Sequence, residues 1–189
     1  HYPLRRQRQM CIRDSLNIGR FTDQKDHYTL LKSIKILKKK YKLNFILLIM
    51  GRGENKINIK NFINKNNLNS HVKVIGFKKN PYKYIRHCNL FVLSSRFEGL
   101  PNVLLEAITL KKLVISSNCP TGPSEILNNG KGGLLFKTGS SNDLAKKINY
   151  FYNNKKKLKK KINFAYNNLD RFDLNTNLRK YLKVITDLF

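Results

Sequence analysis

The stretch Ser95-Arg96-Phe97-Glu98-Gly99-Leu100-Pro101-Asn102-Val103-Leu104-Leu105-Glu106-Ala107 joins an apolar strand to a helix and places two carboxylates, Glu98 and Glu106, eight residues apart. Gly99 allows a ligand to approach the backbone closely, and Pro101 suits a first helical turn, where a missing N–H costs nothing. Free N–H groups at a helix start bind anions such as phosphate. With a carboxylate on either side to hold hydroxyl groups, the stretch predicts a site for a nucleotide sugar.

The two glutamates have an alternative interpretation as ordinary carboxylates of a loop and a helix surface. The helix pattern argues against it, because the apolar residues Leu104, Leu105 and Ile108 are expected to anchor the helix on a sheet. Asn102 and Glu106 are four residues apart and therefore share another side of the helix. The spacing thus predicts a polar edge, from Asn102 to Glu106, that faces the ligand.

Outward from this stretch, apolar runs alternate with helical patterns. The expected strands are 16–19, 44–50, 72–75, 90–93, 113–116 and 133–136. The expected helices are 26–40, 57–66, 81–87, the two-glutamate helix to about 110, 122–127, 142–152, 155–168 and 174–188. This order predicts right-handed βαβ units, and so an α/β fold with a parallel sheet covered by helices on both faces. In such sheets the ligand lies beyond the carboxyl ends of the strands, where these motifs fall.

Two further loops at that edge carry candidate ligand residues. Arg20 and Lys25 follow the first strand, and both can face a diphosphate, one as a bidentate fork and one as a point charge. In a chain this rich in lysine, ordinary loop cations remain the alternative. Gly51-Arg52-Gly53 follows the second strand but lacks the full GxGxxG pattern. We interpret it as a tight turn with positive φ that also lets the backbone approach the ligand.

Aromatic and imidazole side chains give weaker signals. Phe77, after Gly76, is expected either to offer an aromatic edge to a base or to serve the core. His27, His71 and His87 have no partnered Ser or Cys motif, so we do not expect any of them to be catalytic.

Length and cysteine content exclude several classes of protein. The 189 residues fit one domain, and no apolar run is long enough to span a bilayer. Cys11, Cys88 and Cys119 are odd in number and include no CxxC pair, which argues against a disulfide framework and a zinc site. A cytoplasmic setting is the expectation that follows.

The formal net charge of +27 raises the question of an anionic partner. In 30–41 and 155–169 the apolar residues repeat at helical spacing and most of the lysines lie off that stripe, so we interpret both basic runs as solvated helix faces. Attraction to an anionic membrane surface is the lesser alternative. Nucleic acid is disfavoured, since no aromatic and basic recognition motif accompanies the charge.

Residues 1–15 differ from the rest because they are rich in arginine and have neither a strand nor a helix period. They are similar to translated adapter sequence, and the alternative is the tail of an interdomain linker. We expect residues 1–15 to lie outside the fold and residues 16–189 to form the domain.

From about residue 16 to its end, the chain resembles the C-terminal half of a retaining GT-B glycosyltransferase of the GT4 family (glycosyl transferases group 1), a Rossmann-like domain. The residues that support the resemblance are Gly19-Arg20 with Gln24-Lys25, Gly51-Arg52-Gly53, Val74-Ile75-Gly76-Phe77 and, above all, Glu98 to Glu106 as the family's E-x7-E motif. Cys119 to Leu127 resembles a segment of members that build polysaccharides and lipid-linked oligosaccharides, and Gly132 to Phe136 with Asp143-Leu144-Ala145 resembles the closing strand and helix.

The resemblance implies a nucleoside diphosphate-sugar donor, expected to be a UDP-sugar, and transfer with retention without a metal or other cofactor. The implied catalytic residue is Glu98, near the donor sugar, and the implied ribose ligand is Glu106. The expected donor-binding residues are Arg20, Lys25, Gly51, Phe77, Gly99, Leu100, Pro101, Asn102 and Glu106. Basic groups and backbone amides would stabilise the leaving diphosphate.

The resemblance also implies partners that this chain does not itself provide. The acceptor, a polysaccharide or lipid-linked glycan, would bind largely to an N-terminal GT-B domain, so we expect a hexosyltransferase that is inactive as this fragment. The enzyme is expected in the cytoplasm, peripheral on the inner membrane face. The last helix is expected to expose an apolar face around Leu178, Leu182 and Ile185. A nucleotide-sugar epimerase or phosphorylase of the same fold and a basic nucleic-acid-binding module are the alternatives.

Overall fold

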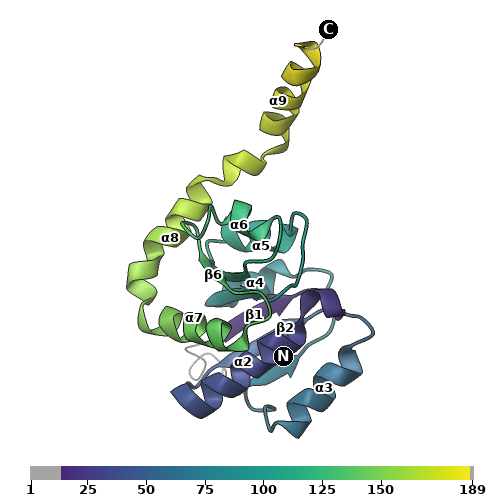
Figure 1. Cartoon of the computed structure of the whole chain (residues 1–189), viewed down its shortest axis with the longest axis vertical. Helices are drawn as coiled ribbons and strands as arrows, with labels where there is room; N and C mark the ends of the chain where they lie inside the picture. Colours follow the sequence, from purple (N-terminus) through teal and green to yellow (C-terminus); the bar gives the residue numbers. More distant parts are fainter. Residues whose placement is uncertain (1–13, 188–189) are drawn as a thin grey trace.

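Six parallel strands form one sheet in the computed structural model, which describes residues 14–187 (Figure 1). The strands are β1 (Asp14–Ile18), β2 (Ile46–Met50), β3 (Val72–Val74), β4 (Leu90–Leu93), β5 (Leu113–Ser117) and β6 (Leu134–Phe136). Their order across the sheet is β3-β2-β1-β4-β5-β6, and every neighbouring pair is parallel. The predicted α/β fold with a parallel sheet is confirmed.

Helices cover both faces of this sheet, as predicted. The helices are α2 (His27–Ile36), α3 (Lys56–Lys65), α4 (Tyr82–His87), α5 (Asn102–Thr109), α6 (Pro123–Ile126), α7 (Ser141–Asn153), α8 (Lys155–Asn167) and α9 (Leu174–Thr186). Buried residues of α2, α3 and α7 belong to one apolar cluster, and those of α4, α5 and α6 belong to a second. Helix α8 connects the two layers, because Leu158 lies in the first cluster and Ala165 in the second.

Strand β4 illustrates why these apolar runs form a sheet rather than helices. Leu90 and Val92 point into the first cluster, whereas Phe91 and Leu93 point into the second. All four side chains are at most 1% exposed. Successive side chains of a strand point to opposite faces, so a strand buried on both faces must be apolar throughout.

The N-terminal boundary needs a correction of two residues. Asp14 and Ser15, expected outside the fold, belong to β1 and pair with Ile46 and Leu47. Because their side chains are polar, the apolar pattern of the sequence did not indicate that the strand begins here. Ser15 Oγ lies 3.0 Å from the hydroxyl oxygen of Tyr152, so this buried hydroxyl has a hydrogen-bond partner. Residues 1–13 lie outside the described residues, so the prediction for them stays a prediction.

The first long helix is interrupted near its end. An unbroken helix was expected over 26–40, but α2 ends at Ile36 and continues as a wider π-helical turn, η2 (Leu37–Tyr41). At its other end Asp26 caps the helix, since its Oδ1 accepts a hydrogen bond of 3.1 Å from the N–H of Thr29. The short 3-10 helix η1 (Asp23–Lys25) precedes this cap, and its position brings Lys25 to the edge of the sheet.

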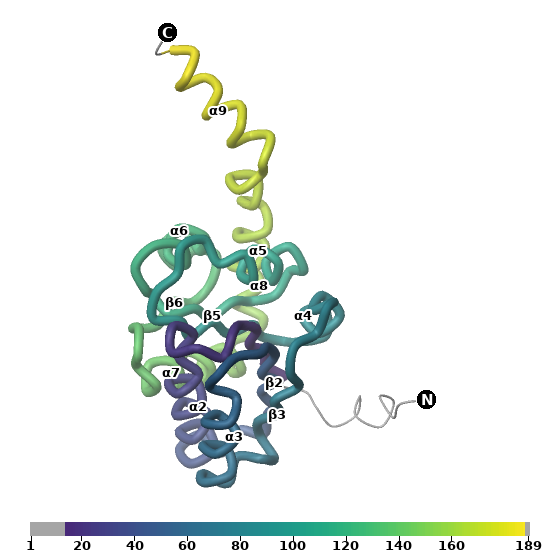
Figure 2. The backbone as a smooth tube through the Cα atoms, turned by 90° about the vertical axis from the view of Figure 1, so that its right-hand side faces the viewer, coloured from purple at the N-terminus to yellow at the C-terminus, as the bar shows by residue number. Residues whose placement is uncertain are grey.

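Helix α9 stands away from the body, joined to α8 through the 3-10 helix η3 (Leu169–Phe172) (Figures 1 and 2). Leu178, Leu182 and Ile185 are 49%, 52% and 38% exposed. The predicted apolar face is confirmed. Among the described residues, no helix combines the length and the apolar character needed to cross a bilayer.

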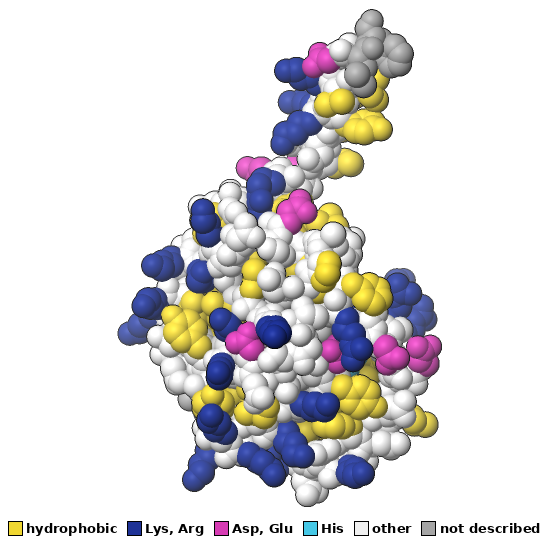
Figure 3. Space-filling model, viewed as in Figure 1, with side chains coloured by type: hydrophobic (Ala, Val, Ile, Leu, Met, Phe, Trp, Pro, Cys, Tyr) yellow, Lys and Arg dark blue, Asp and Glu magenta, His cyan; other side chains and the backbone are white. Residues whose placement is uncertain are grey.

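Basic side chains are scattered over the visible surface rather than gathered in one patch (Figure 3). On α8, Leu158 is buried while the neighbouring Lys156, Lys157 and Lys159 are exposed. The interpretation of the basic runs as solvated helix faces is therefore confirmed for this helix.

Candidate functional site

The loops after β1, β2 and β3 are tied together at the carboxyl edge of the sheet. Gly19 donates its N–H to the carbonyl of Met50 at 3.0 Å, and Gly51 donates its N–H to Gly76 at 3.2 Å. A Cβ at Gly51 would lie 1.9 Å from the carbonyl oxygen of Gly19. Gly51 and Gly53 have φ of 157° and 152°, so the positive φ predicted for this turn is confirmed, and the close packing on Gly19 is a second reason for glycine at position 51.

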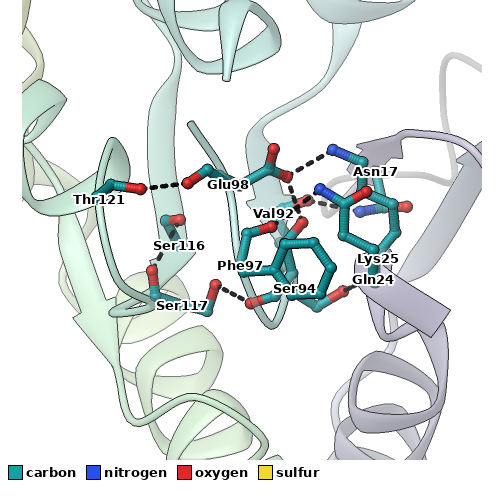
Figure 4. Close-up of polar contacts among 11 residues, drawn as sticks. Asn17, Gln24, Lys25, Val92, Ser94, Phe97, Glu98, Ser116, Ser117 and Thr121 are labelled. Carbon is teal, nitrogen blue, oxygen red and sulfur yellow. Dashed lines mark hydrogen bonds and ion pairs between the residues drawn. The ribbon is translucent and has the colours of Figure 1, made fainter. Parts of the chain in front are cut away.

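An ion pair joins the first loop to the loop after β4 (Figure 4). Lys25 Nζ lies 2.5 Å from Glu98 Oε1, and the hydroxyl of Ser95 donates to the same oxygen at 2.5 Å. The side chains of Lys25 and Glu98 are 16% and 7% exposed, so the pair is largely shielded from solvent. The structure therefore brings two residues of the predicted site into direct contact.

Further hydrogen bonds hold these two loops against each other. The side chain of Gln24 donates to the carbonyl of Phe97 at 3.1 Å, and the N–H of Arg96 donates to the carbonyl of Gln24 at 2.8 Å. The hydroxyl of Ser94 donates to the carbonyl of Lys25 at 2.8 Å. The backbone on both sides of the ion pair is therefore fixed independently of the pair itself.

A third loop, after β5, completes this edge. The hydroxyl of Thr121 donates to the carbonyl of Glu98 (Figure 4). Gly122 has φ of 73°, and a Cβ there would lie 1.9 Å from the carbonyl oxygen of Gly99. Only glycine accepts both this backbone conformation and this close approach. The loops after β1, β4 and β5 thus converge on the segment that contains Glu98.

The start of α5 is open toward solvent. Gly99 and Leu100 are exposed, and a Cβ at Gly99 would meet no atom within 4 Å. Pro101 is the N-cap and has an extended backbone, one position before the expected first turn. Within residues 14–187, the N–H groups of Leu100, Asn102 and Val103 have no hydrogen-bond acceptor. Such free donors at a helix start can bind an anion.

Glu106 lies on α5, one turn beyond its start. Leu104 and Ile108 are buried as predicted for the anchoring face, Leu105 is only partly buried against the same cluster, and Asn102 is exposed. Glu106 is half-buried, and its carboxylate makes no hydrogen bond or ion pair with the rest of the described chain. Burial raises the pKa of the Glu106 carboxyl. A half-buried carboxylate with free acceptor oxygens is a suitable partner for ligand hydroxyl groups.

Two predicted site residues, Arg20 and Phe77, take no part in the hydrogen bonds and the ion pair around Glu98. Arg20 is exposed and has no ion-pair partner in the described part of the chain. Phe77 is 61% exposed, with the guanidinium carbon of Arg52 5.1 Å from its ring centroid, so the alternative of a core role for Phe77 is wrong. Both remain available at the same edge of the sheet, on the loops after β1 and β3.

None of the three described histidines offers general-base chemistry at this edge. His27 is 2% exposed, packs edge-on against Phe21 with ring centroids 5.2 Å apart, and has a pKa lowered by burial to about 4. His71 contacts the carbonyl of Phe45, and His87 is exposed on α4. The imidazole of His27 is therefore a neutral core group at pH 7.

The described cysteines are buried and free. Burial raises the pKa of the Cys88 thiol to about 12, and it also raises the pKa of Cys119. Raised pKa values make both thiols poor nucleophiles. Cys11 lies outside the described residues.

A groove of about 490 Å³ lies along α7, and neither of the two glutamates lines it. It is lined by Tyr41, Leu134, Asp143, Lys146, Lys147, Asn149, Tyr150, Asn153 and Asn154. None of the loops after β1, β4 or β5 contributes to it. The converging loops and polar groups of the predicted site lie at the sheet edge instead.

Sequence reasoning missed the hydroxyl groups that support the predicted site. Ser94 and Ser95 directly follow β4, Ser116 and Ser117 end β5, and all four are fully buried. Polar residues that directly follow an apolar strand are a signal of groups placed at the carboxyl edge, and this signal was present in both serine pairs. The hydroxyl of Thr121 gave no comparable signal.

The parallel sheet and the glutamate-bearing loop at its edge define a Rossmann-like domain of the GT-B glycosyltransferase class. The chain belongs to the family Glycosyl transferases group 1, whose model matches residues 13–168.

Similar proteins agree with this assignment. An uncharacterized glycosyltransferase from Methanocaldococcus jannaschii is 46% identical over 128 residues, which cover 66% of this chain and 31% of that protein. The N-acetylgalactosamine-N,N'-diacetylbacillosaminyl-diphospho-undecaprenol 4-alpha-N-acetylgalactosaminyltransferase of Campylobacter jejuni is 31% identical over 151 residues, 75% of this chain and 40% of that enzyme. The chain thus spans well under half the length of these relatives.

Solved structures support the same fold. A mutant of S. aureus TarM, in complex with fondaparinux, alpha-GlcNAc-glycerol and UDP, superimposes with a TM-score of 0.84 and 26% identity, covering 90% of this chain and 35% of TarM. Anabaena HepE in complex with UDP gives a TM-score of 0.84 at 20% identity and covers 98% of this chain and 52% of HepE. The second likeness concerns the fold alone.

Proposed function

We propose that this chain is the donor-binding half of a retaining GT4-type hexosyltransferase that uses a nucleoside diphosphate-sugar. The observation that carries the proposal is the ion pair of Lys25 and Glu98 beside the open start of α5, with Glu106 one turn further on. The donor would lie across the carboxyl edge of the sheet. UDP is the favoured nucleotide, because it is a ligand named for TarM.

Each part of the donor has a matching group at this edge. The diphosphate meets the free N–H groups at the start of α5 and the cations Arg20 and Lys25. The ribose hydroxyls donate to Glu106, and the donor sugar lies near Glu98 as the catalytic carboxylate. The ring of Phe77 is the proposed contact of the base, and its exposure supports this role.

Charge stabilisation in this account comes from the protein itself. Negative charge develops on the leaving diphosphate, and cations and N–H groups already in place stabilise it most in a site shielded from water. The proposal requires no divalent metal, so transfer by the whole enzyme is expected to persist in excess EDTA. Loss of activity that Mg²⁺ restores would contradict this part.

The acceptor is proposed from the relatives' names. The Campylobacter jejuni enzyme acts on an undecaprenol-linked sugar, and another relative, from Staphylococcus aureus, is a capsular polysaccharide biosynthesis glycosyltransferase. A glycan or lipid-linked glycan is therefore the proposed acceptor, at a cytoplasmic enzyme that lies on the membrane surface. An N-terminal GT-B domain would supply most of that acceptor site, and the chain alone is expected to bind donor without transferring sugar.

Calorimetric titration of the chain with UDP, GDP and their sugar conjugates tests the proposal. Glu106→Gln replaces the charged carboxylate, whose oxygens accept the ribose hydroxyls, with a neutral amide. This change is expected to weaken nucleotide binding about 10- to 100-fold. The matched control is Asp187→Asn, at an exposed carboxylate after α9, which should leave the affinity unchanged. Equal affinities for the wild type and Glu106→Gln would contradict the proposed site.

A further inference from the structure

The carboxylate of Glu98 is held by one oxygen only. Lys25 Nζ and Ser95 Oγ both lie 2.5 Å from Oε1. In the described part of the chain, Oε2 makes no hydrogen bond. The side chain is therefore oriented through Oε1 and presents Oε2 as a free acceptor.

When donor is bound, the ammonium of Lys25 has a second anionic partner besides Glu98. Under the proposed function, on which this inference rests, the same ammonium faces the diphosphate of the donor. A diphosphate carries more negative charge than one carboxylate and offers more acceptor oxygens. Lys25 is a flexible point charge, so it can exchange one partner for the other by rotation of its side chain.

Ser95 cannot move in this way. It is fully buried in the loop just after β4, and its carbonyl accepts a hydrogen bond of 2.6 Å from the hydroxyl of Ser117. The carbonyl of Glu98 is held separately by the hydroxyl of Thr121. The backbone of the Ser95–Glu98 segment is thus fixed from β5 and from the loop after it, independently of Lys25.

We propose that Ser95 is the positioning residue of Glu98, holding Oε1 while Lys25 moves to the diphosphate and Oε2 receives a hydroxyl of the donor sugar. In the unliganded chain Glu98 competes with the diphosphate for Lys25. In the complex, Ser95 alone keeps the carboxylate in place. The adjacent hydroxyl of Ser94 acts differently, because it donates to the backbone of Lys25 and not to Glu98.

The exchange of Lys25 is tested by titration with UDP and GDP, which contain no sugar. Glu98→Gln removes the competing charge and is expected to raise the affinity about fivefold. The control is Asp23→Asn, which removes a negative charge from the same loop without touching the ion pair, and it should leave the affinity unchanged. An unchanged or lower affinity for Glu98→Gln, or an equal gain for Asp23→Asn, would overturn the exchange.

The role of Ser95 is tested by comparing each nucleotide with its sugar conjugates, namely UDP-glucose, UDP-N-acetylglucosamine, UDP-N-acetylgalactosamine and GDP-mannose. Ser95→Ala is expected to weaken binding of the preferred conjugate about fivefold and to leave the bare nucleotide unaffected. Ser94→Ala, at the neighbouring buried hydroxyl, should weaken both ligands equally. Equal loss for both ligands in Ser95→Ala, or no loss for either, would mean that Ser95 does not position Glu98.

The outcomes separate this inference from the proposed function. Failure of the wild-type chain to bind any of these nucleotides contradicts the proposed function, and this inference with it. Nucleotide binding that depends on Glu106 but is insensitive to Glu98→Gln and Ser95→Ala leaves the function intact and overturns only the inference. Thermal unfolding of each variant verifies that it is folded.

Discussion

The Cα of Gly122 packs directly against the carbonyl oxygen of Gly99, so that a Cβ at Gly122 would lie 1.9 Å from it. Gly122→Ala must therefore displace the loop that contains Glu98 and also accept an unfavourable φ of 73°. We expect a loss of about 3 kcal/mol in the free energy of unfolding, together with weaker nucleotide binding. Chemical denaturation and calorimetry measure the two effects.

Gly139→Ala is the matched control for that variant. Gly139 has a nearly equal φ of 75°, but a Cβ there would meet no atom within 4 Å. Only the conformational cost of about 1 kcal/mol is expected, without an effect on nucleotide binding. Equal losses for the two variants would show that the contact with Gly99 does not matter.

The buried His27 predicts a pH dependence of stability. Burial lowers its pKa from 6.5 to about 4 in the folded chain, so the unfolded chain binds more protons between these two values. Stability from this residue is fully present above pH 6.5 and falls as the pH decreases toward 4, by about 3 kcal/mol at most. His27→Phe keeps the ring contact with Phe21 and cannot titrate.

Urea unfolding of the wild type and His27→Phe between pH 7.5 and 4 measures this contribution. As the pH falls, the free energy of unfolding of the wild type should decrease relative to that of His27→Phe. A difference that stays constant over this range would contradict a neutral, buried His27.

The cap of α2 at Asp26 predicts a clear ranking of substitutions. Its carboxylate accepts hydrogen bonds from the N–H of Thr29 at 3.1 Å and from the Thr29 hydroxyl at 2.8 Å, and its φ is 43°. Asn tolerates this φ and keeps the cap, so Asp26→Asn should cost little. Asp26→Ala should cost about 1–2 kcal/mol in the free energy of unfolding. Thermal unfolding that ranks the two variants equally would argue against the cap.

Leucine-to-alanine substitutions in the body and in α9 are expected to have different effects on stability. Leu104 is fully buried under the site, and Leu104→Ala is expected to cost about 2–5 kcal/mol. Leu178 is 49% exposed on α9, and Leu178→Ala should change the free energy of unfolding by less than about 0.5 kcal/mol. A large loss for Leu178→Ala would mean that α9 packs on the body in solution.

Much of the fold could be predicted because burial on both faces leaves a clear mark in the sequence. Runs such as that of β4 are apolar at every position, and the loops that follow them hold the polar site residues at one edge. Strand β1 was placed two residues late because Asp14 and Ser15 break the apolar run. The π-helical turn at Leu37–Tyr41 leaves no comparable mark, since its apolar residues keep the helical stripe.

The residues of the site could be predicted from the sequence, but the contacts between them could not. Glu98 and Glu106 follow from a local motif of the chain. Lys25 and Glu98 are 73 residues apart in sequence, and their ion pair depends on how two loops pack. The hydrogen bond from Ser95 to Glu98 likewise depends on the loop conformation, which cannot be inferred from the hydrophobic periodicity of the sequence.

The most direct test of the central claim is a nuclear magnetic resonance titration of the ¹⁵N-labelled chain with UDP and GDP. We expect the largest shifts at the amides of Leu100, Asn102 and Val103, whose N–H groups have no acceptor within residues 14–187. Glu106→Gln should reduce these shifts at equal nucleotide concentration. Shifts confined to the groove along α7, around Lys147 and Tyr150, would contradict a donor site at the carboxyl edge of the sheet.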